Sequence, residues 1–231
     1  MKSLNINRLG GGGTEPHLAF NLAEILITLG VLGVVAALTM PMLIANYQKK
    51  QTVESLKQAY SLLQHAYEFA QQDYGSIEYW NYKNMSNVAI RDTFFLPYFK
   101  SASVPKSTYK YNTPNWPIWS DGMKNGYIFP ADAVSSCLQT PQNYLYCFRN
   151  LYNGHVIINI DINGIQKGPN RVARDIFMVG FNSDYGNRIE FEGIVTYQHC
   201  NKTSGNGNAC GLKIQRDGWR IKDDYPWRSG R

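Results

Sequence analysis

Charged residues are scarce in this sequence, and over one long stretch they are missing altogether. Asp, Glu, Lys and Arg make up only 17% of the 231 residues, and none occurs in the 24 residues from Ile25 to Gln48. As a helix this uncharged run would be roughly 36 Å long, which exceeds the ~30 Å hydrocarbon core of a bilayer. The missing charge therefore predicts a membrane-spanning helix near the N-terminus.

Basic runs and catalytic motifs are missing as well. The net charge of +6 is not gathered into a basic run, so a mildly basic solvated surface is favoured over a site for DNA or an anionic surface. The sequence has no nucleophile elbow, no phosphate-binding loop and no pair of metal ligands at helical spacing. Its four histidines are scattered, and the consecutive Asp223 and Asp224 would point to opposite faces of a strand. We therefore expect no enzymatic activity.

Cysteine is also rare, with four residues in two close pairs, Cys137 with Cys147 and Cys200 with Cys210. No CxxC spacing or histidine cluster supports a zinc site. In an oxidising compartment the four would pair, in one of three connectivities, whereas in the cytosol they would more often stay free. Given export, proximity in the sequence favours Cys137–Cys147 together with Cys200–Cys210.

The uncharged run is preceded by an acid, Glu24. An ionised carboxylate at the edge of a membrane costs on the order of a few kcal/mol, so it usually has a partner and a function. Residues 1–19 are polar and rich in glycine. A secretory signal peptide places its apolar core before the cleavage site, whereas the small residue Ala19 precedes the apolar core here. Cleavage between Ala19 and Phe20 would therefore keep the apolar helix on the mature protein.

The segment AFNLAEILITLGVLGVVAALTMPMLI resembles the N-terminal cleavage and methylation segment of type IV prepilins and type II secretion pseudopilins. In that family a small residue, usually Gly, precedes Phe, then Thr or Ser, Leu, any residue and Glu, and a long apolar helix follows. Phe20, Leu22 and Glu24 match this pattern, and Pro41 stands where many members have a helix-interrupting proline. Ala19 replaces the usual Gly, and Asn21 replaces Thr or Ser.

The resemblance implies cleavage before Phe20 by a prepilin peptidase, followed by N-methylation of Phe20. The carboxylate of Glu24 would pair with the methylated amine of Phe20 on a neighbouring subunit, where an apolar filament core makes the attraction far stronger than in water. Pro41 would permit a kink or local melting. Further implied partners are other pilins, an inner-membrane assembly platform and its ATPase. The chain would first span the bacterial inner membrane once, with its globular domain outside the cytoplasm. It would then enter a filament in the periplasm or at the cell surface.

Beyond the membrane segment the helix is expected to continue, with Gly75 as its C-cap. Apolar residues recur at alternating steps of three and four and form a single stripe. Aromatic residues at three of the seven positions favour packing on a sheet over a coiled coil. The stripe consists of Val53, Leu56, Tyr60, Leu63, Tyr67, Ala70 and Tyr74.

The rest of the chain predicts a small antiparallel sheet, so the fold class is α+β with the long helix laid on the sheet. Residues 76–150 are expected to be mostly variable loops, with a short helix near Val88–Phe95. Trp80, Trp116 and Trp119 would anchor these loops or, alternatively, form a ligand-binding surface. A turn at Arg216–Trp219 is expected to lead into a last strand. The earlier strands are expected at Tyr127–Phe129, Leu145–Phe148, His155–Ile162, Asp175–Phe181 and Arg188–Tyr197.

The connection from Asp161 to Asp175 contains two strong turn signals, Asn163-Gly164 and Gly168-Pro169-Asn170. It resembles a loop found in a group of bacterial pilin-like proteins. Asp161, Asn163 and Asp175 carry the oxygen ligands that Ca²⁺ prefers, but the acidic ladder and closing Glu of an EF-hand are absent. A structural turn, in which these side chains bind backbone amides, is favoured, with a structural Ca²⁺ site as the alternative.

The predicted organisation is a leader at 1–19, a transmembrane and assembly helix at 20–45, and an extracytoplasmic domain at 46–231. Within that domain an amphipathic helix (46–75) precedes the variable loops (76–150) and the sheet with its C-terminal loop (151–231). The favoured function is that of a structural subunit of a type IV pilus or type II secretion pseudopilus. The alternatives are a minor pilin acting as an adhesin or DNA-binding module, and a membrane-anchored exported binding protein.

Overall fold

The computed structural model describes residues 21–106, 136–151, 154–182, 188–192, 200 and 207–227. Several predicted features lie outside these ranges, namely Ala19, Phe20, Trp116, Trp119 and the strand Tyr127–Phe129. The chain divides into two compact units, Met1–Ile44 and Ala45–Arg231.

The long helix α1 runs without interruption from Leu22 to Tyr74 and therefore belongs to both units. It ends where predicted, because Gly75 adopts a positive φ of 75°, a conformation that suits glycine at a helix C-terminus. Pro41 lies inside the helix without breaking it.

The part of α1 from residue 45 onward buries one stripe against the sheet, as predicted. Five of the seven predicted stripe residues are buried, whereas Tyr60 is half-buried and Tyr74 is 44% exposed. Ala59 and Ala66 are buried as well, which the three-and-four spacing did not single out. Their small side chains let the helix backbone approach the strands closely.

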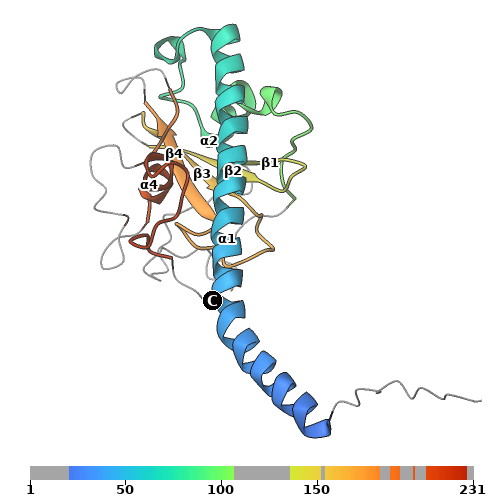
Figure 1. The fold of residues 1–231 in the computed structure, drawn as a ribbon. Helices are drawn as coiled ribbons and strands as arrows, with labels where there is room; N and C mark the ends of the chain where they lie inside the picture. The colour runs from blue at the N-terminus through green and yellow to red at the C-terminus, as the bar shows by residue number, and fades with distance from the viewer. Residues whose placement is uncertain are drawn as a thin grey trace, which may run out of the picture. The chain divides into compact units, whose positions relative to one another are not determined.

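The described part of the chain forms a five-stranded antiparallel sheet in the order β1-β2-β3-β4-β5. Consecutive strands are neighbours, so the sheet is a simple meander (Figure 1). The predicted pairing of the strand before the Asp161–Asp175 loop with the strand after it is confirmed, with Ile160 opposite Phe177. The strands are β1 (Cys137–Gln139), β2 (Leu145–Asn150), β3 (Val156–Asp161), β4 (Ile176–Phe181) and β5 (Glu190–Phe191).

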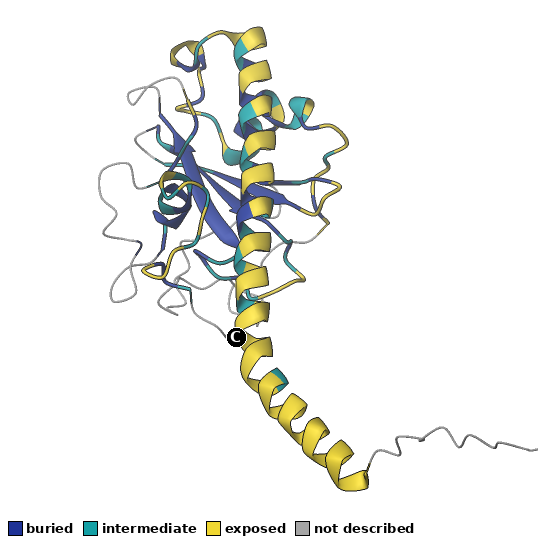
Figure 2. Cartoon of the chain, in the orientation of Figure 1, coloured by how far each residue is buried: buried dark blue, intermediate teal, exposed yellow. Residues whose placement is uncertain are grey.

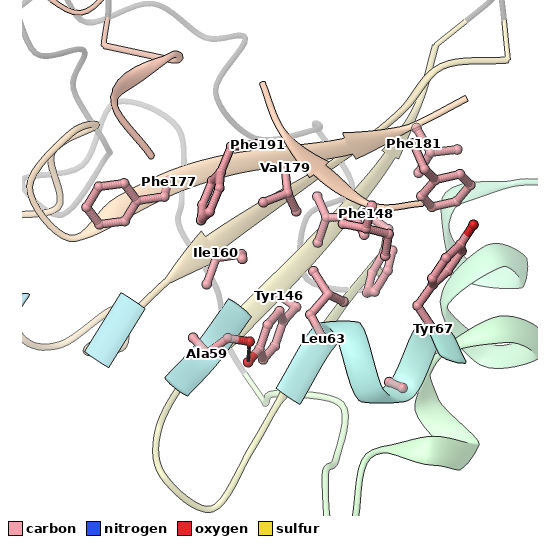
Figure 3. Packing of buried hydrophobic residues seen from close by; sticks show 14 of the residues in the cluster. Ala59, Leu63, Tyr67, Tyr146, Phe148, Ile160, Phe177, Val179, Phe181 and Phe191 are labelled. Carbon is pink, nitrogen blue, oxygen red and sulfur yellow. Dashed lines mark hydrogen bonds between the residues drawn. The ribbon is translucent and has the colours of Figure 1, made fainter. Parts of the chain in front are cut away.

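The two faces of the sheet belong to different apolar clusters, as the alternation along each strand requires. One face packs under α1 and carries most of the aromatic core (Figure 3). The predicted direction of Val156, Ile158, Ile160 and Ile162 toward a common face is confirmed. The other face is also buried, since all six residues of β3 are buried. Its apolar residues include Cys137, Leu145, Cys147, Ile157, Val172, Ile176 and Met178.

Short helices complete the domain. The predicted helix near Val88–Phe95 is α2 (Asn87–Phe94), and its N-cap Ser86 accepts a hydrogen bond from the amide of Ala89 at 3.2 Å. Two single turns of 3-10 helix, Ile77–Tyr79 and Leu96–Tyr98, flank it. Burial of Trp80 against Phe94, with ring centroids 4.4 Å apart, agrees with its predicted role as a loop anchor.

The prediction of a last strand after Arg216–Trp219 is wrong. The described tail instead forms helix α4 (Cys210–Arg216), then the predicted turn, and residues 220–227 contain no strand. Leu212 and Ile214, which precede the turn, are buried from this short helix, which packs on β4 and β5. Gly211 permits this contact, because a Cβ atom there would overlap the ring of Phe191.

Two disulfides staple the sheet and the tail, with the predicted connectivity. Cys137–Cys147 joins directly opposite residues of β1 and β2, and Cys200–Cys210 ties the segment before α4 to its first residue. Each bridge spans a sequence separation of 10. On the chain-entropy model a loop of that size stabilises the fold by roughly 2–3 kcal/mol.

Inside the core, one polar contact links the helix to the sheet. The hydroxyl of Tyr146 donates to the backbone carbonyl of Ala59 at 2.9 Å, and both residues are fully buried (Figure 3). The bond therefore fixes the level at which α1 crosses β2, in addition to the apolar packing around it.

We expect Tyr146→Phe to lower the free energy of unfolding by about 0.5–1.5 kcal/mol, the net contribution of a typical buried hydrogen bond. The ring is kept, and the carbonyl of Ala59 retains its helical amide partner. Tyr79→Phe is the matched control, because Tyr79 is 77% exposed. Urea unfolding should separate the two variants, and equal stabilities would contradict the assigned role of the Tyr146 hydroxyl.

Candidate functional site

The start of α1 is closed by Asn21. Its backbone carbonyl accepts the amides of Glu24 and Ile25, and its side chain accepts the amide of Ala23 at 3.3 Å. Asparagine is among the best N-cap residues, so the departure from Thr or Ser at this position preserves the cap. Glu24 then lies in the first turn, where the helix dipole favours a negative charge. This local stabilisation of the acid was not predicted from the sequence.

The apolar segment of α1 has no cover inside its own unit. Within the described residues 22–44 every side chain is exposed except that of Ala36, which is half-buried. The exposed fractions reach 77% for Leu22, 75% for Leu38 and 70% for Met42. Figure 2 shows this part of the helix in the colour of exposed residues along its length. By length and composition it is long and apolar enough to cross a membrane.

Apart from the carboxylate of Glu24, the polar side chains within the apolar segment are satisfied by the helix itself. The hydroxyl of Thr28 donates to the carbonyl of Ile25 at 2.9 Å, and that of Thr39 donates to the carbonyl of Val35 at 2.9 Å. In a bilayer a polar group without a hydrogen-bond partner costs several kcal/mol. The segment therefore presents an apolar surface whose two hydroxyls need no external partner.

Three of the predicted assembly residues lie in this segment. Leu22 and Glu24 occupy the first turn of α1 and are exposed, and Pro41 lies near the end of the segment. The predicted cleavage and methylation residues, Ala19 and Phe20, precede the described residues. The partner that the resemblance assigns to Glu24, the amine of Phe20 on another subunit, stays a prediction.

The second predicted site, the loop between β3 and β4, is built around two buried carboxylates. One oxygen of Asp161 accepts the amides of Asn163 at 3.0 Å and Gly164 at 2.9 Å, an Asx turn. Gly164 adopts a φ of 80°, and a Cβ atom there would overlap the side chain of Asn143. The turn uses the amides of both Asn163 and Gly164. Glycine is required at position 164 because of its positive φ and the close approach of Asn143 from the β1–β2 hairpin.

Asp175 closes the same loop. Its two carboxylate oxygens accept the amides of Asn170 at 2.8 Å and Arg171 at 2.6 Å. The side-chain amide of Asn163 also lies 3.4 Å from this carboxylate. These contacts agree with the favoured prediction, a structural turn in which acidic side chains bind backbone amides. Among the described residues, no group of three or more His, Cys, Asp and Glu side chains is arranged to hold a metal ion.

The electrostatics of Asp175 are unusual for an aspartate. Burial and the nearby charge of Asp161 raise the pKa of Asp175 from 3.8 to about 7, against the opposing effect of its three hydrogen-bond donors. Only 3% of Asp175 is exposed, and Asp161 is fully buried. The loop therefore holds two acids in one buried turn, which makes its stability sensitive to pH.

The loop also forms the base of the domain, where it meets α1 and the C-terminal segment. Arg174 donates to the side chain of Gln48 at 3.0 Å, and its guanidinium lies 4.4 Å from the ring centroid of Trp227. The hydroxyl of Tyr225 donates to the carbonyl of Ala173 at 2.7 Å. These contacts border a polar cleft of about 400 Å³ between the loop, the β1–β2 hairpin and α1.

Sequence reasoning missed the residues that tie this base together. Arg174 lies inside the recognised loop motif and Trp227 inside the recognised tail, yet no spacing in the sequence pairs them. Their contact depends on a tail that returns to α1 after α4. The sequence carried a recognisable pattern only for Asp161, Asp175 and the turn-forming residues between them, because these interact with neighbours close in the sequence.

Comparison with known proteins identifies the family. Residues 42–229 match the model of a family of unknown function (DUF6613), and the chain belongs to that family. The match covers the domain beyond the apolar segment and leaves residues 22–41 outside. No curated protein and no solved structure matches the chain.

The raised pKa of Asp175 predicts a pH dependence of stability. A carboxyl with a higher pKa in the folded state binds more protons there than in the unfolded state, so its contribution to stability is lost as the pH rises from about 4 to about 7. Asp175→Asn should remove this component, so that its free energy of unfolding falls less over that range than that of the wild type.

The exposed Asp223→Asn serves as the control for this pH series and should follow the wild type. Parallel curves for all three proteins would contradict the assignment. An NMR titration of the wild-type Asp175 carboxyl carbon tests the same claim without a substitution, and a midpoint near 4 would overturn it.

Proposed function

We propose that this chain is a pilin-like structural subunit that is embedded in the membrane by α1 and polymerises through the same segment. Cleavage before Phe20 would leave the apolar segment at the mature N-terminus. The segment would then exchange lipid for the helices of neighbouring subunits in a type IV pilus or type II secretion pseudopilus. No catalytic role is proposed for the domain beyond residue 45.

The observation that carries this proposal is the uncovered apolar surface of residues 22–44. Leu, Ile, Val and Met side chains are exposed there all around the helix rather than on one side. Exposed apolar area of this extent is not sustained in water and marks contact with a membrane or with another protein. A helix that is apolar all around fits lipid first and a bundle of like helices afterwards.

Glu24 supports assembly over simple anchoring. The helix dipole would stabilise this acid in an anchor as well, but only assembly would supply a cationic amine on a neighbouring chain as its partner. The pairing would also set the axial position of one subunit against the next. The N-cap at Asn21 holds the start of α1 in helical form, which places Glu24 on a defined surface.

The domain beyond residue 45 fits a location outside the cytoplasm. Both cysteine pairs form disulfides, and disulfides persist in oxidising compartments. A stapled sheet under a long helix gives a rigid body that a filament could display. The two disulfides and the apolar segment together support export of a chain that keeps this segment.

The test is assembly of Glu24→Ala in the native host. We expect the variant in the membrane fraction at wild-type amounts. In sheared or cross-linked polymers its amount should fall by at least about a hundredfold, since removing one partner of a buried ion pair costs about 3–5 kcal/mol. Immunoblots of the two fractions measure both quantities.

Glu68→Ala is the matched control, because Glu68 is an exposed acid on the same helix, beyond the apolar segment. It should assemble like the wild type. Normal polymer content of Glu24→Ala would favour a membrane-anchored exported protein over a filament subunit. Loss of both variants from polymers would point to a general effect of helix charge instead.

A further inference from the structure

A second groove lies on the opposite side of α1 from the Asp161–Asp175 loop, where the C-terminal segment returns to the helix. It has a volume of about 580 Å³. Val53 on α1 and Trp219 and Ile221 on the returning segment form its apolar part. Val53 is 5% exposed, whereas Trp219 and Ile221 are half-buried and keep part of their surface in the groove.

The end of α4 creates this groove. The amide of Trp219 donates to the carbonyl of Ile214 at 2.8 Å, and that of Gly218 donates to Gln215 at 3.1 Å. Both Gly218 and Trp219 have positive φ, so the chain reverses sharply after the helix. The indole of Trp219 then lies against Tyr60 and Phe191, with centroids 6.2 Å away in each case. The reversal brings Arg220 beside α1.

The rim of the groove is cationic. Lys49 and Lys50 come from α1 and Arg220 from the returning segment, against a single acid, Glu54, in the lining. Within the described residues no ion pair or hydrogen bond involves the side chains of the three cations. The charges of the neighbouring tail are by contrast paired with one another, as Lys213 with Asp217 at 2.9 Å.

The position of the groove along the chain indicates what it meets. Lys49 directly follows Gln48, the last residue of the uncharged run. If that run spans the bilayer, the groove begins at the lipid headgroups on the outer side. Tryptophan and basic residues are the side chains that prefer this level of a membrane.

We propose that this groove binds the phosphate headgroup of an anionic phospholipid in the bilayer that holds α1. The three cations would contact the phosphodiester and its neighbours, and Trp219 would lie at the boundary of headgroup and acyl chain. Each basic residue near an anionic surface strengthens the attraction by about fivefold. This inference rests on the membrane location under the proposed function. It adds a lipid partner and a way to hold the domain at the surface before assembly.

The experiment reconstitutes the full chain into phosphatidylcholine vesicles. It measures, by spin-label spectroscopy, the association of labelled phosphatidylglycerol relative to labelled phosphatidylcholine. The wild type should prefer phosphatidylglycerol. The triple variant Lys49→Gln, Lys50→Gln, Arg220→Gln should reduce this preference by at least about fivefold. The charge-retaining pair Lys49→Arg, Lys50→Arg should keep it, which separates charge from any effect on folding.

The control variant replaces three other exposed cations, with Lys83, Lys100 and Lys106 each changed to Gln, and should keep the preference. An equal loss in the control would mean that only net charge matters and would overturn the site. Displacement of the labelled lipid by inorganic phosphate, but not by chloride at the same ionic strength, would assign the groove to free phosphate and overturn the lipid. If two chains cross-link through the groove and no preference for phosphatidylglycerol is measured, the groove binds a second copy of the chain. That result would overturn the lipid.

Two failures are distinguishable in this design. A chain that does not float with the vesicles overturns the membrane location and the groove together. A chain that floats but shows no preference for phosphatidylglycerol overturns the groove alone and leaves the proposed subunit function in place.

Discussion

The apolar surface of residues 22–44 is the constraint on which the rest of this molecule depends. A helix with Leu, Val, Ile and Met exposed on every side has to be covered by lipid or by protein, and its own unit supplies no cover. Asn21 caps the start of the helix, and the hydroxyls of Thr28 and Thr39 donate to carbonyls of the same helix. Few polar groups of the segment are therefore left without a hydrogen-bond partner. Glu24 in the first turn is then the group of this segment that would need a specific partner.

The remainder of α1 changes role once the uncharged run ends. From Val53 onward a single stripe packs on the meander, and the Tyr146–Ala59 bond holds helix and sheet in register. The Asp161–Asp175 loop braces the base of the domain against α1 through Arg174. Disulfides reinforce the edge strand and the tail. The domain beyond residue 45 is thus held together by its own contacts, whereas the segment 22–44 has no cover within its own unit.

Sequence patterns predicted those parts of the fold that depend on neighbours close in the chain. The α1 stripe, the C-cap at Gly75, the β3–β4 pairing and the turn acids all arise from local spacing. The strand expected after Trp219 does not form, and helix α4 was not predicted, because only contact with Phe191 shows why Gly211 lies in a helix. Arg174–Trp227 and the Lys49–Arg220 groove join segments far apart in the sequence, for which a single sequence carries no signal.

The central claim is that the apolar segment is kept at the N-terminus of the mature protein as an assembly surface. Mass spectrometry of the protein purified from the membrane fraction of its native host tests this most directly. We expect a chain that begins at Phe20 and carries one methyl group on its amine. A chain that retains residues 1–19, or one cleaved after Ala37 so that most of the segment is lost, would contradict it.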